Sequence, residues 1–564
     1  MKRINKFILT SLLLTGFLWF GNSCADLEVE NLMAPDREQA LANVSDILSL
    51  LDGGMDRVYD GMGHWRNFHI DAWADQGSET NAWSGFWFFA QEPRNRIPNT
   101  STWSDRENIQ DPWNRFNAGV NIANEILKST VDEGNELIDP DTKVDYTHVA
   151  IATAYFLKGI SQGYLGMIYD KAYIVDTDSD LSALEFATYD VLIDNAVASL
   201  KLAWEYAAAH PFDDWRFMVG SSDYDSDDFI KIAKSYAARI MAGQARNQTE
   251  GNALDWSTIS SYASAGITED FNPRSSNTWY IWYHDWQCSL MGMKSPYLHA
   301  DIKIPYYATK YFPEDAANMY TWEDNNYPWE YPTDEAIKLG PAASKDQRIG
   351  PRFVWYDDEG DSFYGVPTGE DTWEVIDPAT ASDYGDFVYT PDFGYLRSAR
   401  GRHLFTNYVF VRYQEQYWPA YIYDDNNYTH LMLAWEMTLL QAEAQLNLSG
   451  EAAARDVINN SSPITNARED RGGLAPLDGT IPVIEIIDYE YCIELYSTGK
   501  FLQWISMRRW NRLKKGTPLH MPVPAAELEV TGDELYSFGG SAYADGIGTA
   551  DGSNAWAPLH GGKK

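Results

Sequence analysis

Tryptophan and tyrosine residues interleaved with amides, acids and arginines are the feature of this sequence that points most directly to chemistry. The mixture occurs in "NAWSGFWFFAQEPRNR", in "STWSDRENIQDPW", and again in "NTWYIWYHDW" and "TWEDNN". Indole rings stack on the flat C–H faces of sugar rings, whereas sugar hydroxyls need amide, carboxylate or guanidinium partners. The candidate ligand-binding residues are Trp83, Trp87, Arg94, Asn95, Trp103, Trp279, Trp282, Trp286, Trp322 and Asp324. Because a single ring is more often packed in a core, we expect at least one ring of each cluster, and not all of them, at the surface.

The sequence gives weaker evidence for catalytic residues than for a ligand-binding surface. Glycoside hydrolysis needs two carboxyl groups at a set distance across a cleft. With 82 acidic residues in the chain, pairs close in sequence arise by chance and show no such distance. The sequence has no Walker loop, no dinucleotide fingerprint and no H-E-x-x-H pair. We therefore expect no catalytic residues, with a helical glycoside hydrolase as the weakest alternative.

Two acidic runs resemble the beginning of a calcium loop. They are "DTDSDLS" from Asp176 and "DYDSDD" from Asp223. Both lack glycine at the sixth position and glutamate at the twelfth, which an EF-hand loop requires. We interpret them as solvated turns and expect no metal site and no cofactor; a loose calcium site is the minor alternative.

Composition restricts the class further. The chain has 564 residues, a formal net charge of -39 and 45% hydrophobic residues, so it is globular and acidic. An acidic surface repels a phosphate backbone, which argues against nucleic acid as a partner. Three cysteines without a C-x-x-C pair exclude a disulfide framework, a zinc ribbon and a redox dithiol.

The N-terminus has the pattern of a lipoprotein signal. A basic start, "MKRINK", is followed by the short apolar run "FILTSLLLTGFLWFG", small residues and Cys24. The run is too short to span a bilayer comfortably but fits a signal-peptide core. We therefore expect cleavage after residue 23 and lipid on Cys24. The alternative is an ordinary signal peptide with an incidental cysteine.

The rest of the chain shows mainly helical periodicity. One predicted helix aligns Phe116, Val120, Ala123 and Leu127, and a second aligns Ala152, Phe156, Gly159, Gly163 and Gly166. A third aligns Ala233, Ala237 and Ile240, and a fourth aligns Leu431, Trp435, Leu439, Ala442 and Leu446 before a turn at Ser449–Gly450. Seams of small residues let helices approach closely, as in tetratricopeptide-like hairpins.

Helical periodicity fades between residues 271 and 427, where Pro, Gly, Asp, Asn and aromatic residues dominate. The predicted fold is mainly α, a tetratricopeptide-like scaffold of helical hairpins with long, irregular, loop-rich insertions. The predicted organisation is a signal peptide over 1–23, an N-terminal helical region over 24–270, a loop-rich aromatic region over 271–427, and a C-terminal hairpin and Pro-flanked tail over 428–564.

Several segments, in order, resemble the SusD/RagB family of surface nutrient-binding lipoproteins. They include "NAGVNIANEIL", "AIATAYFLKGISQGYLGMIYDKAYIV", "DDFIKIAKSYAARIMAGQAR", "LAWEMTLLQAEAQLNLSGEAAARDVIN" and "DYEYCIELYSTGKFLQWISMRRWNRLKKGTPLHMPVPAAELEV". The last contains Arg509-Trp510 and a strand flanked by Pro522 and Pro524. We assign Trp435 and Trp510 to the core, and Arg508 and Arg509 to structural pairing with buried acids.

The resemblance implies a protein that binds without catalysing. It would be anchored by lipid to the extracellular face of the outer membrane and would cover a SusC-like TonB-dependent transporter, to which it would pass glycans. The acidic residues Asp26, Glu28 and Glu30 after Cys24 resemble the family's signal for export to the cell surface. Peptides or another nutrient as cargo of the same complex are the principal alternative. Residues 271–427 match nothing specific in the family.

Overall fold

The computed structural model describes most of the chain. The described residues are 43–63, 69–79, 85–91, 93–217, 224–275, 298–315, 341–352, 354–358, 361–367, 373–376, 383–389, 408–413, 427–428, 430–462, 466–499 and 501–550. The chain divides after Ile47 into a short N-terminal unit and a large unit, and the description that follows concerns the large unit. No helix in the described residues is long and apolar enough to cross a membrane.

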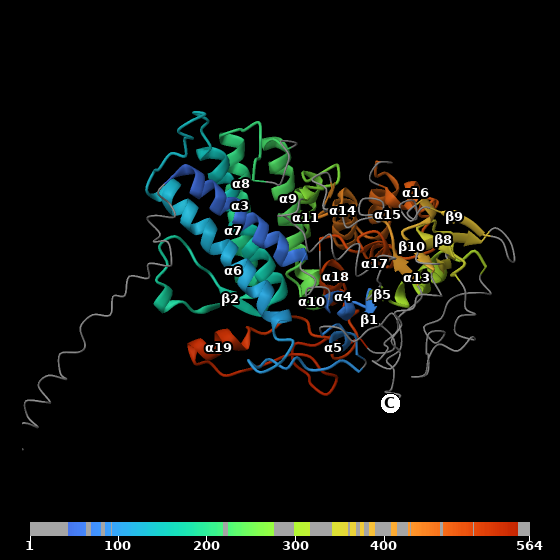
Figure 1. The fold of residues 1–564 in the computed structure, drawn as a ribbon. Coiled ribbons are helices and arrows are strands. Elements are labelled where there is room, and N and C mark those ends of the chain that lie inside the picture. Colours follow the sequence, from blue (N-terminus) through green and yellow to red (C-terminus); the bar gives the residue numbers. More distant parts are fainter. Residues whose placement is uncertain are drawn as a thin grey trace, which may run out of the picture. The chain divides into compact units, whose positions relative to one another are not determined.

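Helices dominate the large unit, which confirms the predicted fold class. They are α3 (Val44–Gly63), α4 (His69–Trp73), α5 (Phe86–Ala90), α6 (Glu107–Leu127), η2 (Lys128–Asp132), α7 (Thr147–Ile168), η3 (Leu181–Ala183), α8 (Tyr189–Ala209), α9 (Ser226–Ala242), α10 (Gln248–Ala253), α11 (Trp256–Ser264), α13 (Lys303–Tyr311), α14 (Ala434–Ser449), α15 (Glu451–Asn459), α16 (Ala467–Asp470), α17 (Val483–Ile493), α18 (Leu502–Arg509) and α19 (Ala525–Thr531). Figure 1 shows α6, α7 and α8 side by side, followed by α9, α11, α14 and α15. Each of these helices packs mainly against its neighbours in the series, as in stacked hairpins.

The seam of small residues lies on α7, as predicted. A Cβ on Gly159 would lie 2.6 Å from Cγ of Leu200 on α8, and a Cβ on Gly166 would lie 3.0 Å from Cδ1 of Ile193 on the same helix. Glycine at these positions therefore sets how closely α7 and α8 approach. The predicted apolar faces of α6 and α9 are buried as well, including Phe116, Val120 and Ile240.

The C-terminal hairpin also agrees with the sequence, with one difference. Gly450 joins α14 to α15 at a φ of +92°, a backbone conformation that glycine adopts readily. Trp435 and Leu439 are buried in the core between α14, α15 and α17. Leu431 is buried but precedes α14, because its backbone pairs with Phe271 instead of continuing the helix.

Short strands occupy the described parts of residues 271–427, where the sequence predicts loops. The strands of the described residues are β1 (Gly77–Glu79), β2 (Lys171–Tyr173), β3 (Phe186–Thr188), β4 (Arg274–Ser275), β5 (Leu298–Ala300), β6 (Ile349–Arg352), β7 (Val354–Asp358), β8 (Asp361–Pro367), β9 (Trp373–Ile376), β10 (Phe387–Tyr389), β11 (Tyr408–Phe410) and β12 (Asn427–Tyr428). They form small sheets in the orders β11-β10-β6 and β7-β8-β9, and the pairs β1-β5, β2-β3 and β4-β12. Most are too short for an alternating pattern to stand out among the surrounding Gly, Pro and Asp residues. The predicted boundaries at 270 and 427 stay predictions.

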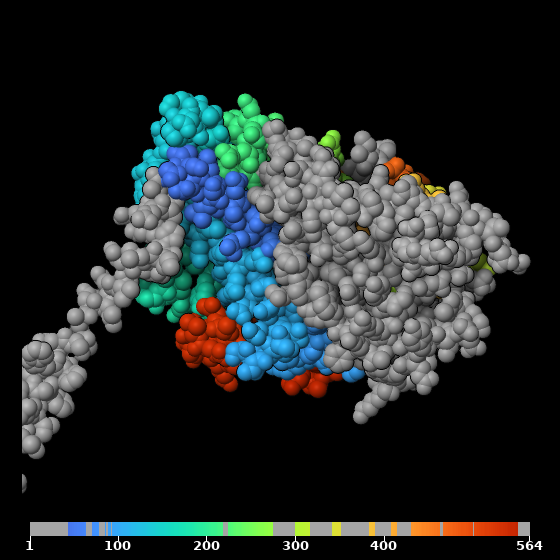
Figure 2. All heavy atoms as spheres, in the orientation of Figure 1, coloured from blue at the N-terminus to red at the C-terminus, as the bar shows by residue number. Residues whose placement is uncertain are grey.

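The segment before α6 lies against the C-terminal part of the chain. The backbone N–H of Ile97 donates to the carbonyl of Phe538 at 3.0 Å. The Asn99 amide donates to the carbonyls of Val523 and Tyr536 and accepts from the N–H of Ala525 at the beginning of α19, each at 2.9 Å. Figure 2 shows the two segments in contact at the surface, blue against red. The first aromatic cluster of the sequence is therefore joined to a scaffold far away in sequence.

Candidate functional site

A ladder of aromatic rings leads from the core to the surface through the first aromatic cluster. Trp504 and Trp73 are buried, with ring centroids 5.8 Å apart, and Trp73 packs on the buried Phe89 at 4.8 Å. Phe88 and Trp103 are half-buried, and their ring centroids lie 5.4 Å apart. The outer pair, Phe88 and Trp103, thus has a partly exposed aromatic surface with rigid support beneath it.

Local backbone structure fixes the position of Trp103. Its N–H donates to the carbonyl of Thr100 at 3.2 Å, and its own carbonyl accepts from the N–H of Arg106 at 3.3 Å and from the Arg106 guanidinium at 3.3 Å. Thr102, Ser104 and Arg106, close to Trp103 in sequence, are exposed. Exposed hydroxyl and guanidinium groups thus occur in the same segment as a half-exposed indole, a combination of groups that suits sugar recognition.

Arg94 lies inside the protein, away from solvent. Its guanidinium donates to the Asp75 carboxylate at 2.6 Å, to the hydroxyl of Thr517 at 3.2 Å and to the carbonyl of Phe89 at 3.2 Å. Both charged groups of the Arg94–Asp75 pair are only 2% exposed. Arg94 thus joins the aromatic segment to the C-terminal part of the chain, and we do not include it in the proposed ligand surface.

Asn95 is half-buried, and its amide donates to the side-chain oxygen of Gln91 at 2.7 Å. Trp87 lies in α5, but its side chain is outside the described part of the structure. The remaining candidates, Trp83, Trp279, Trp282, Trp286, Trp322 and Asp324, lie outside the described residues, as does Cys24. The described surface of the site is therefore built around Trp103.

Phe88 was not among the predicted ligand residues, although the sequence contains a signal for it. The run "FWFFA" forms a single turn of helix, α5, which begins after Gly85 at a φ of +87°. Side chains in one helical turn point in all directions around the axis, so consecutive rings cannot all be buried on one face. At least one aromatic ring of α5 is therefore expected near the surface, and Phe88 is half-buried beside Trp103.

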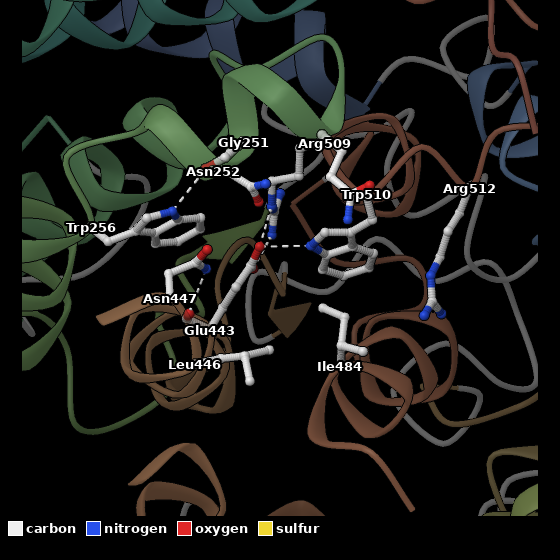
Figure 3. A pocket seen from close by; sticks show the side chains of 11 residues that line it. Gly251, Asn252, Trp256, Glu443, Leu446, Asn447, Ile484, Arg509, Trp510 and Arg512 are labelled. Atoms are coloured by element: carbon white, nitrogen blue, oxygen red, sulfur yellow. Dashed lines mark hydrogen bonds and ion pairs between the residues drawn. The ribbon is translucent and has the colours of Figure 1, made fainter. Parts of the chain in front are cut away.

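The C-terminal Arg-Trp pair forms a buried polar contact with α14. The Arg509 guanidinium donates to both carboxylate oxygens of Glu443, at 2.8 and 2.5 Å, and the indole N–H of Trp510 donates to the same carboxylate at 2.7 Å (Figure 3). The predicted structural role of Arg509 and the core position of Trp435 are confirmed. Trp510 is 9% exposed and also lines a cavity.

Arg508 departs from the prediction of an acidic partner. Its described hydrogen bonds go to the carbonyls of Leu519, at 2.8 Å, and Gly243, at 2.5 Å. Burial holds the pKa of Arg508 well below its ordinary value, and the neighbouring Arg246 lowers it further. Carbonyl oxygens can hold a buried guanidinium in place. A prediction that pairs basic with acidic residues does not find such contacts, because every residue has a backbone carbonyl.

Buried carboxylates serve the fold. Glu490 and Glu494 on and after α17 receive the guanidinium of Arg348 at 2.8 and 3.1 Å. Burial favours a raised pKa for Glu494, but Arg412, Arg471 and Arg348 outweigh it and hold that pKa below its ordinary value. Such a cluster of paired charges has the character of a structural network.

The two acidic runs form turns and caps. The Asp225 carboxylate caps α9 by accepting from the N–H groups of Asp227 and Asp228, at 2.8 and 3.0 Å. Asp180 caps η3 in the same way through Ser182. Among the described residues, no group of three or more His, Cys, Asp or Glu side chains is arranged to hold a metal ion.

Proteins of known structure share this architecture, as a comparison with them shows. No family model and no curated protein matches the sequence. A SusD superfamily protein from Parabacteroides distasonis has a similar structure, with a TM-score of 0.54, 13% identity, and coverage of 87% of this chain and 98% of that chain. A SusD homologue from Bacteroides thetaiotaomicron has a TM-score of 0.50 and 14% identity, with 86% and 89% covered. A SusD-like carbohydrate-binding protein from Bacteroides fragilis has a TM-score of 0.50 and 12% identity, with 83% and 86% covered. The chain therefore has the fold of SusD-superfamily proteins.

Proposed function

We propose that this protein binds glycans at a surface that includes Trp103 and Phe88, and delivers them to a SusC-like TonB-dependent transporter without altering them. The observation that carries the proposal is the half-exposed ring pair, which is supported by buried rings and lies in a segment with exposed polar residues. The SusD-like fold gives independent support, because one structural neighbour is a carbohydrate-binding protein.

The charge of the chain fits a neutral ligand. With a net charge of -39, the protein repels polyanions at long range, while neutral oligosaccharides experience no such force. Stacking and hydrogen bonding are short-range and change little with salt. Glycan binding at this surface is therefore expected to be nearly independent of ionic strength.

The location of the protein belongs to the same proposal. A lipid on Cys24 would tether the protein to the outer membrane and leave residues after it on the extracellular side. The high local concentration of a tethered binder around the transporter would favour transfer of captured glycan. The membrane contact would then be made by the lipid anchor alone.

Replacement of Trp103 by alanine tests the ligand surface. We expect Trp103→Ala to weaken binding to the polysaccharide that the wild-type protein retains by about 1 to 3 kcal/mol, because one stacking ring is removed. That loss corresponds to roughly 5- to 150-fold in Kd and is measurable by isothermal titration calorimetry after an affinity-gel panel. Tyr206→Ala is the matched control, because Tyr206 is a half-buried aromatic residue on α8, outside the first aromatic cluster.

Three results would contradict the proposal. Equal binding by Trp103→Ala and wild type would remove Trp103 from the ligand surface. Binding of peptides in the absence of binding to any polysaccharide would favour the alternative cargo. Release of reducing ends from a bound polysaccharide by the purified protein would make it a hydrolase.

A further inference from the structure

A cavity of about 280 Å³ lies between helices of the scaffold, and neither Trp103 nor Phe88 lines it. It is bounded by α10 and α11 on one side, α14 below, and α17 and the end of α18 on the other. In Figure 3, the rings of Trp256 and Trp510 lie on the two sides of the Glu443 carboxylate, Asn252 lies above it, and Asn447 lies between it and Trp256. Its volume is just under the range of about 300 to 1,000 Å³ typical of small-molecule sites.

The charged groups that line the cavity are already paired. Arg509 and Glu443 neutralise one another through two hydrogen bonds. Arg512 donates to Glu485 at 2.6 Å and to Asp488 at 2.7 Å. A charged ligand would have to displace one of these pairs, which is costly for groups that are largely buried. The site therefore favours a neutral ligand.

The remaining lining combines an apolar floor with a rim of amides. Leu446 and Ile484 are half-buried, and the largely buried Trp510 also lines the cavity. Gln248, Asn252 and Asn447 are exposed at the rim. The Asn447 amide N–H donates to the carbonyl of Glu443 at 2.9 Å, and the side chains of Gln248 and Asn252 form no hydrogen bond with any residue that the structure describes. Amide groups that are both donors and acceptors thus surround an apolar surface.

We propose that this cavity binds a single neutral sugar unit, as a second site distinct from the Trp103 surface. A pyranose presents an apolar C–H face to the floor and adjacent hydroxyls, each a donor and an acceptor, to the amides of the rim. A peptide bound as an extended strand pairs its N–H and C=O groups with a row of backbone partners, whereas the polar groups at this rim are side-chain amides. The proposal does not depend on Trp103, because different elements form the two sites.

Saturation-transfer NMR with glucose, galactose, mannose and xylose, each added separately to the full chain, tests this site. Asn252→Trp places an indole at the rim, where Asn252 is exposed, so the cavity is blocked without loss of a described contact. Asn121→Trp is the matched control, because Asn121 is an exposed asparagine on α6 and is not part of the cavity lining. We expect at least one of the sugars to bind the wild type saturably, and Asn252→Trp to weaken that binding by about tenfold or more.

The expected pattern also separates the two sites. Trp103→Ala and Asn121→Trp should leave monosaccharide binding unchanged, while Asn252→Trp should leave the Trp103-dependent binding of polysaccharide in place. Absence of monosaccharide binding to the wild type, or equal binding by Asn252→Trp, would overturn the second site. A different result would assign the cavity to peptides and overturn the sugar proposal. In that case N-acetylalanine amide binds the wild type, Asn252→Trp abolishes this binding, and none of the four sugars binds.

Discussion

Buried charge pairs join helices that are far apart in sequence. Arg239 on α9 donates to Glu436 on α14 through two hydrogen bonds, at 2.8 and 2.6 Å, and to the hydroxyl of Tyr164 at 3.1 Å. Both charged side chains are at most 2% exposed. Removing one charge of such a pair leaves the other buried without compensation, which is far more costly than the loss of a surface pair.

Substitution of Glu436 tests this difference. We expect Glu436→Gln to lower the free energy of unfolding by about 3 to 5 kcal/mol, because Arg239 keeps its charge in a dry site. Glu205→Gln is the matched control, because it removes a pair with Lys201 in which both side chains are 56% exposed. The control should change stability by less than about 1 kcal/mol in urea unfolding. Equal effects of the two substitutions would contradict a structural role for the buried pair.

Asp170 should make stability depend on pH. Burial raises the pKa of Asp170 to about 6, against the opposing effect of the Tyr536 hydroxyl, which donates to it at 2.8 and 2.9 Å. Between pH 4 and pH 6 the folded state therefore holds a proton that the unfolded state releases. The free energy of unfolding consequently falls as pH rises through this window, by no more than about 3 kcal/mol from this group.

The variant Asp170→Asn does not titrate and isolates this contribution. The difference in unfolding free energy, variant minus wild type, is expected to increase from pH 4 to pH 6 and then to level off. Urea unfolding at intervals of pH, followed by circular dichroism, measures this difference. A difference that stays constant across the window would show that Asp170 does not bind its proton more tightly in the folded state.

At the scale of elements, glycine determines how α7 and α8 pack. A Cβ on Gly159 would lie 2.6 Å from Cγ of Leu200 and 3.0 Å from the backbone oxygen of Ala196, so α8 would have to move. The backbone atom leaves little room for adjustment by rotamer changes alone. The small-residue stripe seen in the sequence is therefore a packing requirement and not a general preference for alanine and glycine.

Gly159→Ala is expected to destabilise the protein by about 1 to 3 kcal/mol, because a methyl group is forced into a filled interface. Gly53→Ala on α3 is the matched control, because Gly53 is exposed and a Cβ added there would meet no atom within 4 Å. That substitution should be neutral or stabilise the helix by up to about 1 kcal/mol. Thermal unfolding of both variants makes the comparison, and a loss of stability only in Gly53→Ala would refute the packing argument.

The helices could be predicted from the sequence, whereas many contacts between residues distant in sequence could not. The 3.6-residue period of α6, α7 and α9 follows directly from which residues must be buried, as Phe116 and Ile240 show. The pairing of β10 with β6 and β11, and the partners of Arg508, depend on residues distant in sequence, which no local pattern contains. In the same way, Arg94 has the residue type of a sugar ligand, but its buried partner Asp75 was not evident from the sequence.

At the scale of the whole molecule, the proposed function depends on where the protein is anchored. Its 82 acidic and 43 basic residues give a strongly charged, well solvated chain, and its likeness to SusD-superfamily folds extends over most of the chain. A single acyl chain anchors a protein only marginally, whereas several chains on one cysteine hold it stably. The proposed capture of glycans near a transporter therefore depends on what Cys24 carries.

Cys24→Ser tests this anchor in the bacterium that produces the protein. Metabolic labelling with an alkyne analogue of palmitate should label the wild type, and Cys24→Ser should lose both the label and retention in the membrane fraction, because serine offers no thiol for acylation. Cys288→Ser is the matched control and should keep both, since Cys288 lies outside the N-terminal signal pattern. An unlabelled wild type, or Cys24→Ser that remains labelled and in the membrane fraction, would show that Cys24 is not the attachment site. The Trp103 surface would then have to reach its transporter by protein contacts alone.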